Sequence, residues 1–518
     1  MPPAPPSRPS DSHQSAAWIE LWSLREDTLL EQQPGDGSLI LRSQWGDLHI
    51  PRPGAVLSEA LRRMLLGPVQ LENVPGTEEL AARVRLLAAL RQLGGLVVRS
   101  VGAPDGEQPL LSVLPTATGA RLDPAPVPED RPLRLSRFAA LRSNGRGSLL
   151  ESPLSPFRAV FTRPEAGWLI ASLCRPITLD AAAERLPVAR PAVAALLSHL
   201  VPTGMVEVAD PAPQADGCPR PATFPEDRDP ALLPWSPDDL RFHWSSRPGL
   251  HDGQFGATYP LRGRQEQPPA LKPPPPGPRI ELPRPAAGPP DWDTSLVEAL
   301  ERRRSVRRHG TAALTLRQLG ELLHRSLRVR DAGEPLPSGR TRPPGSRPYP
   351  SGGACYELEF YLTVGRCAGL EPGAYYYDPL GHALIRLPAA GQLNSALLRE
   401  AQAGTGMTEP PDLLLTMTAR FARVSWKYSG LAYALTLKHV GVMQQTLYLV
   451  ATGMGLAACA LGTGSTSLSA EAFGLDWRVE SAVGEFVLGP LPETGPPPET
   501  GPPPARPAEP NPVAGRAE

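Results

Sequence analysis

A run of prolines constrains this chain more than any other feature. The segment LKPPPPGPRIELPRPAAGPP, residues 271–290, lacks many of the backbone N–H groups that a helix or a central strand needs. We therefore expect an extended, Pro-rich linker region over residues 211–290. Because 518 residues also exceed what one hydrophobic core usually organises, separate domains are expected before and after it.

The first 210 residues contain a pattern that occurs twice. The segments GDGSLILRS and GRGSLLES each combine a turn signal with an apolar strand, and each is followed by a helix that begins at a proline. Each copy then closes with an apolar helix, a glycine and a short β-branched strand. This duplication predicts two winged-helix-like units, over residues 16–125 and 130–210.

Charge and end composition exclude several classes of protein. Lys and Arg number 52 against 53 Asp and Glu, so no strong field would attract nucleic acid or a membrane surface. The chain shows no signal peptide and no membrane-spanning apolar run, which favours a cytoplasmic protein. By composition, residues 1–15 and the tail 490–518 are expected to be disordered.

Five cysteines are spread through the chain without any CxxC spacing. This spacing indicates neither a disulfide framework nor a metal site. We interpret these residues mainly as small buried side chains, with Cys218 as a thiol in the linker region.

Residues 291–489 combine helices and strands and contain three places that suit a cofactor. In EALERRRSVRRHG, the side chains of Arg303, Ser305 and Arg307 fall at alternate positions near a helix end. Guanidinium groups bind phosphate or carbonyl oxygens in a forked geometry, and a hydroxyl can complete such a site. A solvated arginine-rich helix face explains the same run and remains the alternative.

The second place is the turn in RPYPSGGACYELEFYLTV, which comprises Pro350, Ser351, Gly352 and Gly353. Glycine lets backbone N–H groups approach a planar ring or a phosphate closely, because no side chain intervenes. A tight turn before an apolar strand would have the same sequence.

The third place is a long helix and the glycine loop after it. Residues spaced by three or four define an apolar stripe of about six helical turns, which we interpret as core. The stripe comprises Tyr433, Leu437, Val440, Met443, Leu447, Val450 and Met454. The loop that follows contains Gly462 and Gly464, although it matches no nucleotide-binding fingerprint.

Lys427 and Tyr428 stand together just before this helix, in VSWKYSGLAYALTLKHV. Both side chains exchange protons, so the pair suits acid–base catalysis if its surroundings adjust the lysine. A surface lysine beside a core tyrosine is the alternative interpretation.

Taken together, ERRRSVR, YPSGGA, WKYSGLAYALTLKHVGVMQQTLYLVATGMGLAACALGTGS and VGEFVLG resemble the SagB-type dehydrogenases of the nitroreductase superfamily. The front half is similar to the winged-helix-like region of that family's longer members. The resemblance implies an α+β protein. Its C-terminal domain, residues 291–489, would be a nitroreductase-like FMN domain with an antiparallel-rich sheet, preceded by the two winged-helix-like units.

The same resemblance implies a function. The family binds FMN at a homodimer interface, and many members oxidise peptidyl thiazolines and oxazolines to thiazoles and oxazoles. The partners would be an azoline-containing precursor peptide and the cyclodehydratase of the same pathway. Lys427 and Tyr428 fall on the family's catalytic pair, while His439 replaces an expected acidic residue and is interpreted as a core or surface histidine.

The cofactor contacts that the resemblance implies form three groups. Arg303, Ser305 and Arg307 would bind the phosphate and the pyrimidine edge of FMN. The turn from Pro350 to Gly353 would line the isoalloxazine, together with Gly462 and Gly464. Two other functions remain open at this point: a general NAD(P)H-dependent nitro- or quinone reductase, and a peptide-holding scaffold without catalysis.

Overall fold

The computed structural model describes residues 18–35, 37–105, 108–145, 147–211, 221–286, 292, 294–330, 345–389 and 391–493. The chain divides into two compact units, Met1–Gly253 and Gln254–Glu518. The disorder predicted for residues 1–15 and for most of the tail 490–518 lies outside the described residues, as does Cys218. Each unit is considered by itself.

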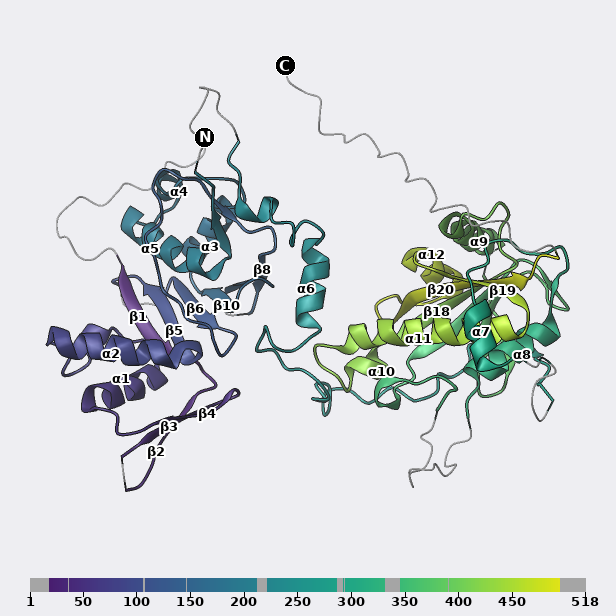
Figure 1. Cartoon of the computed structure of the whole chain (residues 1–518), viewed down its shortest axis with the longest axis horizontal. Helices are drawn as coiled ribbons and strands as arrows, with labels where there is room; N and C mark the ends of the chain where they lie inside the picture. Colours follow the sequence, from purple (N-terminus) through teal and green to yellow (C-terminus); the bar gives the residue numbers. More distant parts are fainter. Residues whose placement is uncertain are drawn as a thin grey trace, which may run out of the picture. The chain divides into compact units, whose positions relative to one another are not determined.

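The first unit is built on a six-stranded antiparallel sheet with the order β1-β5-β6-β10-β9-β8. A second sheet has the order β2-β3-β4, and β7 pairs with β11. Helices cover these sheets (Figure 1). The elements are β1 (Ile19–Leu24), β2 (Leu29–Gln32), β3 (Leu39–Ser43), β4 (Gly46–Ile50), α1 (Ala55–Leu66), α2 (Leu80–Leu93), β5 (Val97–Gly102), β6 (Leu111–Pro115), β7 (Leu133–Leu135), β8 (Ala140–Ser143), β9 (Ser148–Glu151), β10 (Phe157–Phe161), α3 (Pro164–Ser172), α4 (Leu179–Arg185), α5 (Arg190–Leu200), β11 (Val206–Val208) and α6 (Pro237–Ser245).

The two predicted winged-helix-like units are joined rather than separate. Strand β6 of the first pairs with β10 of the second, so one sheet runs through both. Val101 and Val113 from the first half are buried in the same core as Phe157 and Leu196 from the second. A boundary between residues 125 and 130 therefore does not separate two hydrophobic cores.

The second unit is built on a seven-stranded sheet with the order β12-β17-β16-β14-β18-β20-β19, in which neighbouring strands are antiparallel. This agrees with the antiparallel-rich α+β domain that the sequence predicts. The elements are β12 (Arg279–Glu281), α7 (Leu296–Arg302), β13 (Leu314–Thr315), α8 (Leu316–Leu327), β14 (Leu358–Val364), β15 (Cys367–Ala368), β16 (Gly373–Asp378), β17 (Ala383–Arg386), α9 (Gly391–Thr405), β18 (Leu413–Arg420), α10 (Phe421–Ser425), α11 (Ala432–Gly453), β19 (Leu456–Leu461), α12 (Thr466–Phe473) and β20 (Glu480–Pro490).

Both faces of this sheet are covered by helices. Along β14, Phe360 and Leu362 belong to a core with α8 and α11, whereas Tyr361 between them belongs to a second core with α9 and α12. This follows from the two-residue period of a strand, which sends neighbouring side chains to opposite faces. Since both faces are buried, every residue of β14 is buried.

Helix α11 confirms the predicted long helix, but its apolar stripe is only partly core. Val440, Met443 and Leu447 are buried against the sheet, as predicted. Tyr433 and Leu437 in the first two turns are 47% and 38% exposed, which corrects that part of the stripe.

The segment predicted as an extended linker makes tertiary contacts. Residues 279–281 form β12 and pair with β17 at the edge of the seven-stranded sheet. Upstream, Lys272 lies 2.5 Å from Glu480 and donates to the hydroxyl of Tyr361 at 2.7 Å. Proline is tolerated here because an edge strand has N–H groups that need no ladder partner. We call residues 254–283 the strap.

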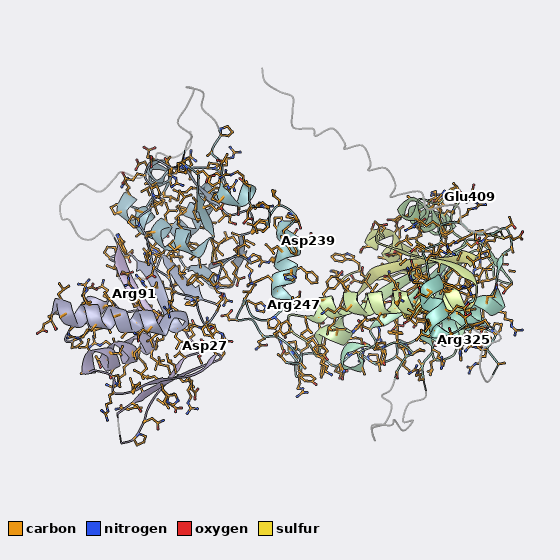
Figure 2. The ribbon with its side chains drawn as sticks, in the orientation of Figure 1. Asp27, Arg91, Asp239, Arg247, Arg325 and Glu409 are labelled. Atoms are coloured by element: carbon orange, nitrogen blue, oxygen red, sulfur yellow. The ribbon has the colours of Figure 1, made fainter. Side chains whose placement is uncertain are left out.

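Charged side chains of both signs are distributed over the outside of each unit, as Figure 2 shows for Asp27, Arg91, Asp239, Arg247, Arg325 and Glu409. This agrees with the formal net charge of −1. Among the helices of the described ranges, none has both the length and the apolar character needed to cross a membrane.

Replacing Leu447 with alanine tests the packing of α11. Leu447 is fully buried, so the truncation should lower the free energy of unfolding of the second unit by about 3 kcal/mol, through lost burial and a residual cavity. Leu437→Ala on the same helix removes the same atoms from a 38% exposed site and should cost less than about 1 kcal/mol. Urea unfolding measures both, and equal losses would contradict this packing.

Candidate functional site

Lys427 and Tyr428 lie in the short connection between α10 and α11, and both side chains end at Gly353. The Lys427 ammonium is 3.5 Å from the Gly353 carbonyl oxygen and 5.4 Å from the centre of the Tyr428 ring. A Cβ atom placed on Gly353 would lie 2.5 Å from the Tyr428 hydroxyl and 2.6 Å from the Lys427 ammonium. The structure thus brings the predicted catalytic pair to the predicted PSGG turn.

The backbone conformation at position 353 also favours glycine. Its φ of +61° lies in the left-handed region, which glycine adopts without steric cost. Gly352–Ala354 form one turn of 3-10 helix at this place, preceded by Ser351 in an extended conformation. Pro350 is exposed, whereas Ser351 and Gly352 are half-buried.

The strap holds the backbone at Lys427 and just after Tyr428, the predicted catalytic pair. Gly256 and Ser429 exchange both backbone hydrogen bonds, and the N–H of Tyr259 donates to the carbonyl of Lys427 at 3.0 Å. The Tyr259 ring packs edge-on against Trp426 at 5.7 Å between centroids. Position 427 is therefore fixed by main-chain contacts from a segment about 170 residues earlier in the chain.

The predicted phosphate-binding residues lie beside a different part of α11, at Tyr448. The Ser305 hydroxyl is 2.7 Å from the Tyr448 hydroxyl, and the Arg303 guanidinium lies 5.3 Å from the centre of the same ring. The N–H of Ala460 donates to the Tyr448 oxygen at 2.7 Å, so this hydroxyl joins β19 to Ser305. Arg307 is exposed.

Gly462 and Gly464 border a cavity of about 380 Å³. Most of its other lining residues come from α11 and β20 and include Tyr433, Gln444 and Glu485. Gly464 has a steric reason to be glycine, because a Cβ atom there would collide with the Glu485 carboxyl group. Gly462 is exposed and has open space around it.

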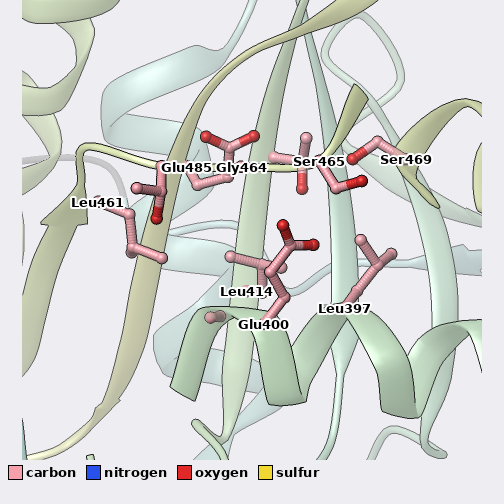
Figure 3. Close-up of a pocket in the computed structure, with 11 residues that line it drawn as sticks. Leu397, Glu400, Leu414, Leu461, Gly464, Ser465, Ser469 and Glu485 are labelled. Carbon is pink, nitrogen blue, oxygen red and sulfur yellow. The ribbon is translucent and has the colours of Figure 1, made fainter. Parts of the chain in front are cut away.

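Glu485 is a buried acid that the sequence interpretation did not identify. It lies at a small pocket into which Glu400 also projects from α9, beside Ser465 and Ser469 (Figure 3). Burial disfavours the ionised carboxylate, and the negative charge of Glu400 adds to this, so the pKa of Glu485 rises to about 7. The pKa of Glu400 is also raised by its partial burial.

These residues fit FMN in chemistry. The arginines at 303 and 307 with Ser305 would hold a phosphate, and the cavity beside Gly462 and Gly464 has room for a planar ring. The PSGG turn contacts the start of α11 near His439, while Ser305 contacts Tyr448 nine residues later. At 1.5 Å per residue, these two levels are roughly 13 Å apart along the helix.

Sequence reasoning missed three functional candidates: Glu357, His439 as a bonded group, and Glu485. His439 is buried, with its Nδ1 atom 2.6 Å from Glu357 and its Nε2 atom 2.7 Å from the Gly352 nitrogen. The one available signal was the histidine where an acidic residue was expected. Nothing in the local sequence marks Glu357, just before β14, or Glu485, in the middle of β20, as a buried acid.

The raised pKa of Glu485 predicts a pH-dependent loss of stability. Below pH 4.5 the folded and unfolded chains both hold this proton, so burial of the carboxyl costs nothing extra. As the pH rises toward 7 the unfolded chain releases its proton first, and about 3 kcal/mol of stability is lost. Glu485→Gln stays neutral and should lack this loss, so urea unfolding of the two proteins should diverge between pH 4.5 and 8. Parallel curves would contradict the raised pKa.

Comparison with protein families identifies two regions of the chain. The nitroreductase family matches residues 300–489, which include β20, α11, Ser305 and the PSGG turn. The cyanobactin oxidase ThcOx matches residues 133–252, from β7 to the end of the first unit. The strap and the first 132 residues belong to neither match.

Three curated relatives are similar to parts of this chain. MJ1384 of Methanocaldococcus jannaschii, which carries the nitroreductase name, is 29% identical over 33% of this chain and 79% of its own length. The microcin B17-processing protein McbC of Escherichia coli is 33% identical over 26% of this chain and 52% of its own. The trifolitoxin-processing protein TfxB of Rhizobium leguminosarum bv. trifolii is 29% identical over 27% and 38%. The chain thus spans about half of McbC and less of TfxB.

Among solved structures, the Escherichia coli microcin synthetase McbBCD complex with truncated pro-MccB17 contains a chain that is 25% identical to this one. The similarity covers 37% of this chain and 71% of that chain, with a TM-score of 0.31. The assignment of the chain rests on the two family matches. The chain carries a nitroreductase-family domain over residues 300–489, preceded by a region of the cyanobactin oxidase type over residues 133–252.

Proposed function

We propose that this protein is an FMN-dependent dehydrogenase that oxidises thiazolines or oxazolines in a peptide to thiazoles or oxazoles. One observation carries the proposal: the Lys427 and Tyr428 side chains both end at Gly353 in the PSGG turn. Two relatives named for the processing of peptides, microcin B17 and trifolitoxin, and the match to a cyanobactin oxidase support a peptide substrate.

The chemistry requires two groups that act on one ring. Converting an azoline to an azole removes a hydride and a proton, and bound FMN supplies a two-electron acceptor. Lys427 would take the proton from the ring carbon. Tyr428, whose hydroxyl ends at the same glycine, would orient the ring or pass the proton on.

The cofactor contacts remain part of this proposal. Arg303, Ser305 and Arg307 would hold the phosphate, where two guanidinium groups match its charge. Gly462 and Gly464 would admit the isoalloxazine to the cavity that they border. Pro350, Ser351, Gly352 and Gly353 would present backbone to the ring from the side of the catalytic pair.

We also propose that two copies of the chain build the site. The PSGG turn and the arginines contact levels of α11 that are about 13 Å apart. One copy could therefore contribute the turn and the second copy the arginines of the same site. Apolar side chains on α7 are available for such a contact, since Leu296 and Val297 are 65% and 70% exposed. The precursor peptide and the cyclodehydratase that forms its azolines would be the other partners, in the cytoplasm.

Oxidation of an azoline peptide tests the function directly. The purified flavoprotein should lower the mass of a thiazoline-bearing peptide by about 2 Da per ring. Lys427→Ala should lower the rate by about 100-fold or more, because general-base catalysis is worth that much. Lys438→Ala, which removes an exposed lysine on α11, is the matched control and should keep the rate.

Two results would overturn this function. Unchanged peptide mass with flavin bound and intact wild-type protein would exclude the azoline substrate. Steady NAD(P)H consumption with nitroaromatics or quinones, unaffected by Lys427→Ala, would favour the general reductase that the nitroreductase family match also permits.

Dimerisation is tested by flavin retention. If two copies share the site, sedimentation should show a dimer, and dilution below its dissociation constant should release the flavin. Leu296→Glu places a charge on the exposed face of α7 and should lower both dimer content and bound flavin. A monomer that stays fully loaded would contradict the shared site.

A further inference from the structure

A buried histidine connects helix α11 to the turn that faces the catalytic pair. His439 lies in the second turn of α11 and is 6% exposed. Its Nδ1 atom is 2.6 Å from Oε1 of Glu357, which is fully buried just before β14. Its Nε2 atom is 2.7 Å from the backbone nitrogen of Gly352.

The partners of this ring determine where its proton is. The Gly352 N–H is a donor, so Nε2 must accept and carries no hydrogen. The single ring proton of the neutral imidazole is then on Nδ1 and is donated to the Glu357 carboxylate. His439 therefore acts as a neutral bridge between a buried carboxylate and a backbone amide.

Glu357 also binds Ser351, the residue before Gly352 in the turn. The Ser351 hydroxyl donates to its second oxygen at 3.3 Å, and the same hydroxyl accepts the N–H of Tyr356 at 3.0 Å. Ser351 is thus tied to this carboxylate directly, Gly352 is tied to it through His439, and Tyr356 through the Ser351 hydroxyl. With Lys427 and Tyr428 packed directly against Gly353, a shift of this turn would move the surface that they contact.

We propose that His439 is a positioning residue, which Glu357 orients and which holds the Ser351–Gly353 turn in place against Lys427 and Tyr428. The catalytic consequence rests on the proposed function, whereas the structural consequence does not. Removing the imidazole leaves the Gly352 N–H and the buried Glu357 carboxylate without these bonds. Both groups then gain by moving toward water, so the turn opens.

Cys355 reports on this opening without any substrate or flavin. It caps the 3-10 turn, its N–H donates to the Gly352 carbonyl at 3.3 Å, and its thiol is buried. Cys367 and Cys459 are buried elsewhere in the same unit, and Cys174 is exposed in the other. Labelling with a thiol reagent, read by peptide mass mapping, therefore contains its own controls.

In the full-length protein, His439→Ala should raise the labelling rate of Cys355 at least tenfold, with Cys367 and Cys459 unchanged. His439→Gln should restore protection, because its side-chain carbonyl can still accept the Gly352 N–H. His309→Ala removes another buried, carboxylate-paired histidine, which lies 3.2 Å from Asp412, and should leave Cys355 protected. Unchanged Cys355 labelling in His439→Ala, or equal labelling in the Gln and Ala variants, would overturn the proposal.

Two further measurements separate the possible failures. Labelling of Cys367 and Cys459 in His439→Ala would show a general loss of structure. In that case Glu357→Ala provides the same test from the carboxylate end of the bridge. Protection of Cys355 in Glu357→Ala would then overturn the proposal. With an azoline peptide, His439→Ala should lower kcat about tenfold or more and leave KM unchanged, because alignment and not binding is affected. If the wild type lacks turnover, the proposed function fails while the labelling result still decides the role of His439.

Discussion

The packing of α11 against the seven-stranded sheet is the contact on which the candidate site depends. Val440, Met443 and Leu447 are buried in the core beneath this helix, and each turn of the helix then presents a different group to the site. His439 reaches the PSGG turn, and Tyr448 reaches Ser305 two and a half turns later. Because an α-helix is stiff over this length, burial of one face fixes the spacing between the two groups.

Buried carboxylates form a second organising feature of this domain. Glu357 is paired with His439, Glu359 with Arg420 and Tyr376, and Glu480 with Lys272 of the strap. A buried charge needs a partner because the interior solvates it poorly. Glu485 faces Glu400 instead, and its burial together with that negative charge raises its pKa to about 7. This places a carboxyl group with a raised pKa next to the cavity bordered by Gly462 and Gly464.

Several elements could be predicted from sequence because their signals are local. The long helix α11 appeared as a three- and four-residue apolar period, and the glycines at 352 and 353 marked a turn before a strand. The Lys427–Tyr428 pair and the arginine run were found by resemblance to a family. The strap was interpreted as a linker because proline content is a local property, whereas the pairing of β12 with β17 depends on a strand about 100 residues away.

The long helix, the glycine turn and the residue types at the candidate site could be read from the sequence, since period and composition are written along the chain. Only the tertiary structure decided that Lys427 and Tyr428 both end at Gly353, that His439 bridges Glu357 and Gly352, and that Glu485 is buried beside Glu400. These relations join positions roughly 70 to 90 residues apart. No local period encodes them, because they arise only when the sheet, the strap and α11 bury their apolar faces together.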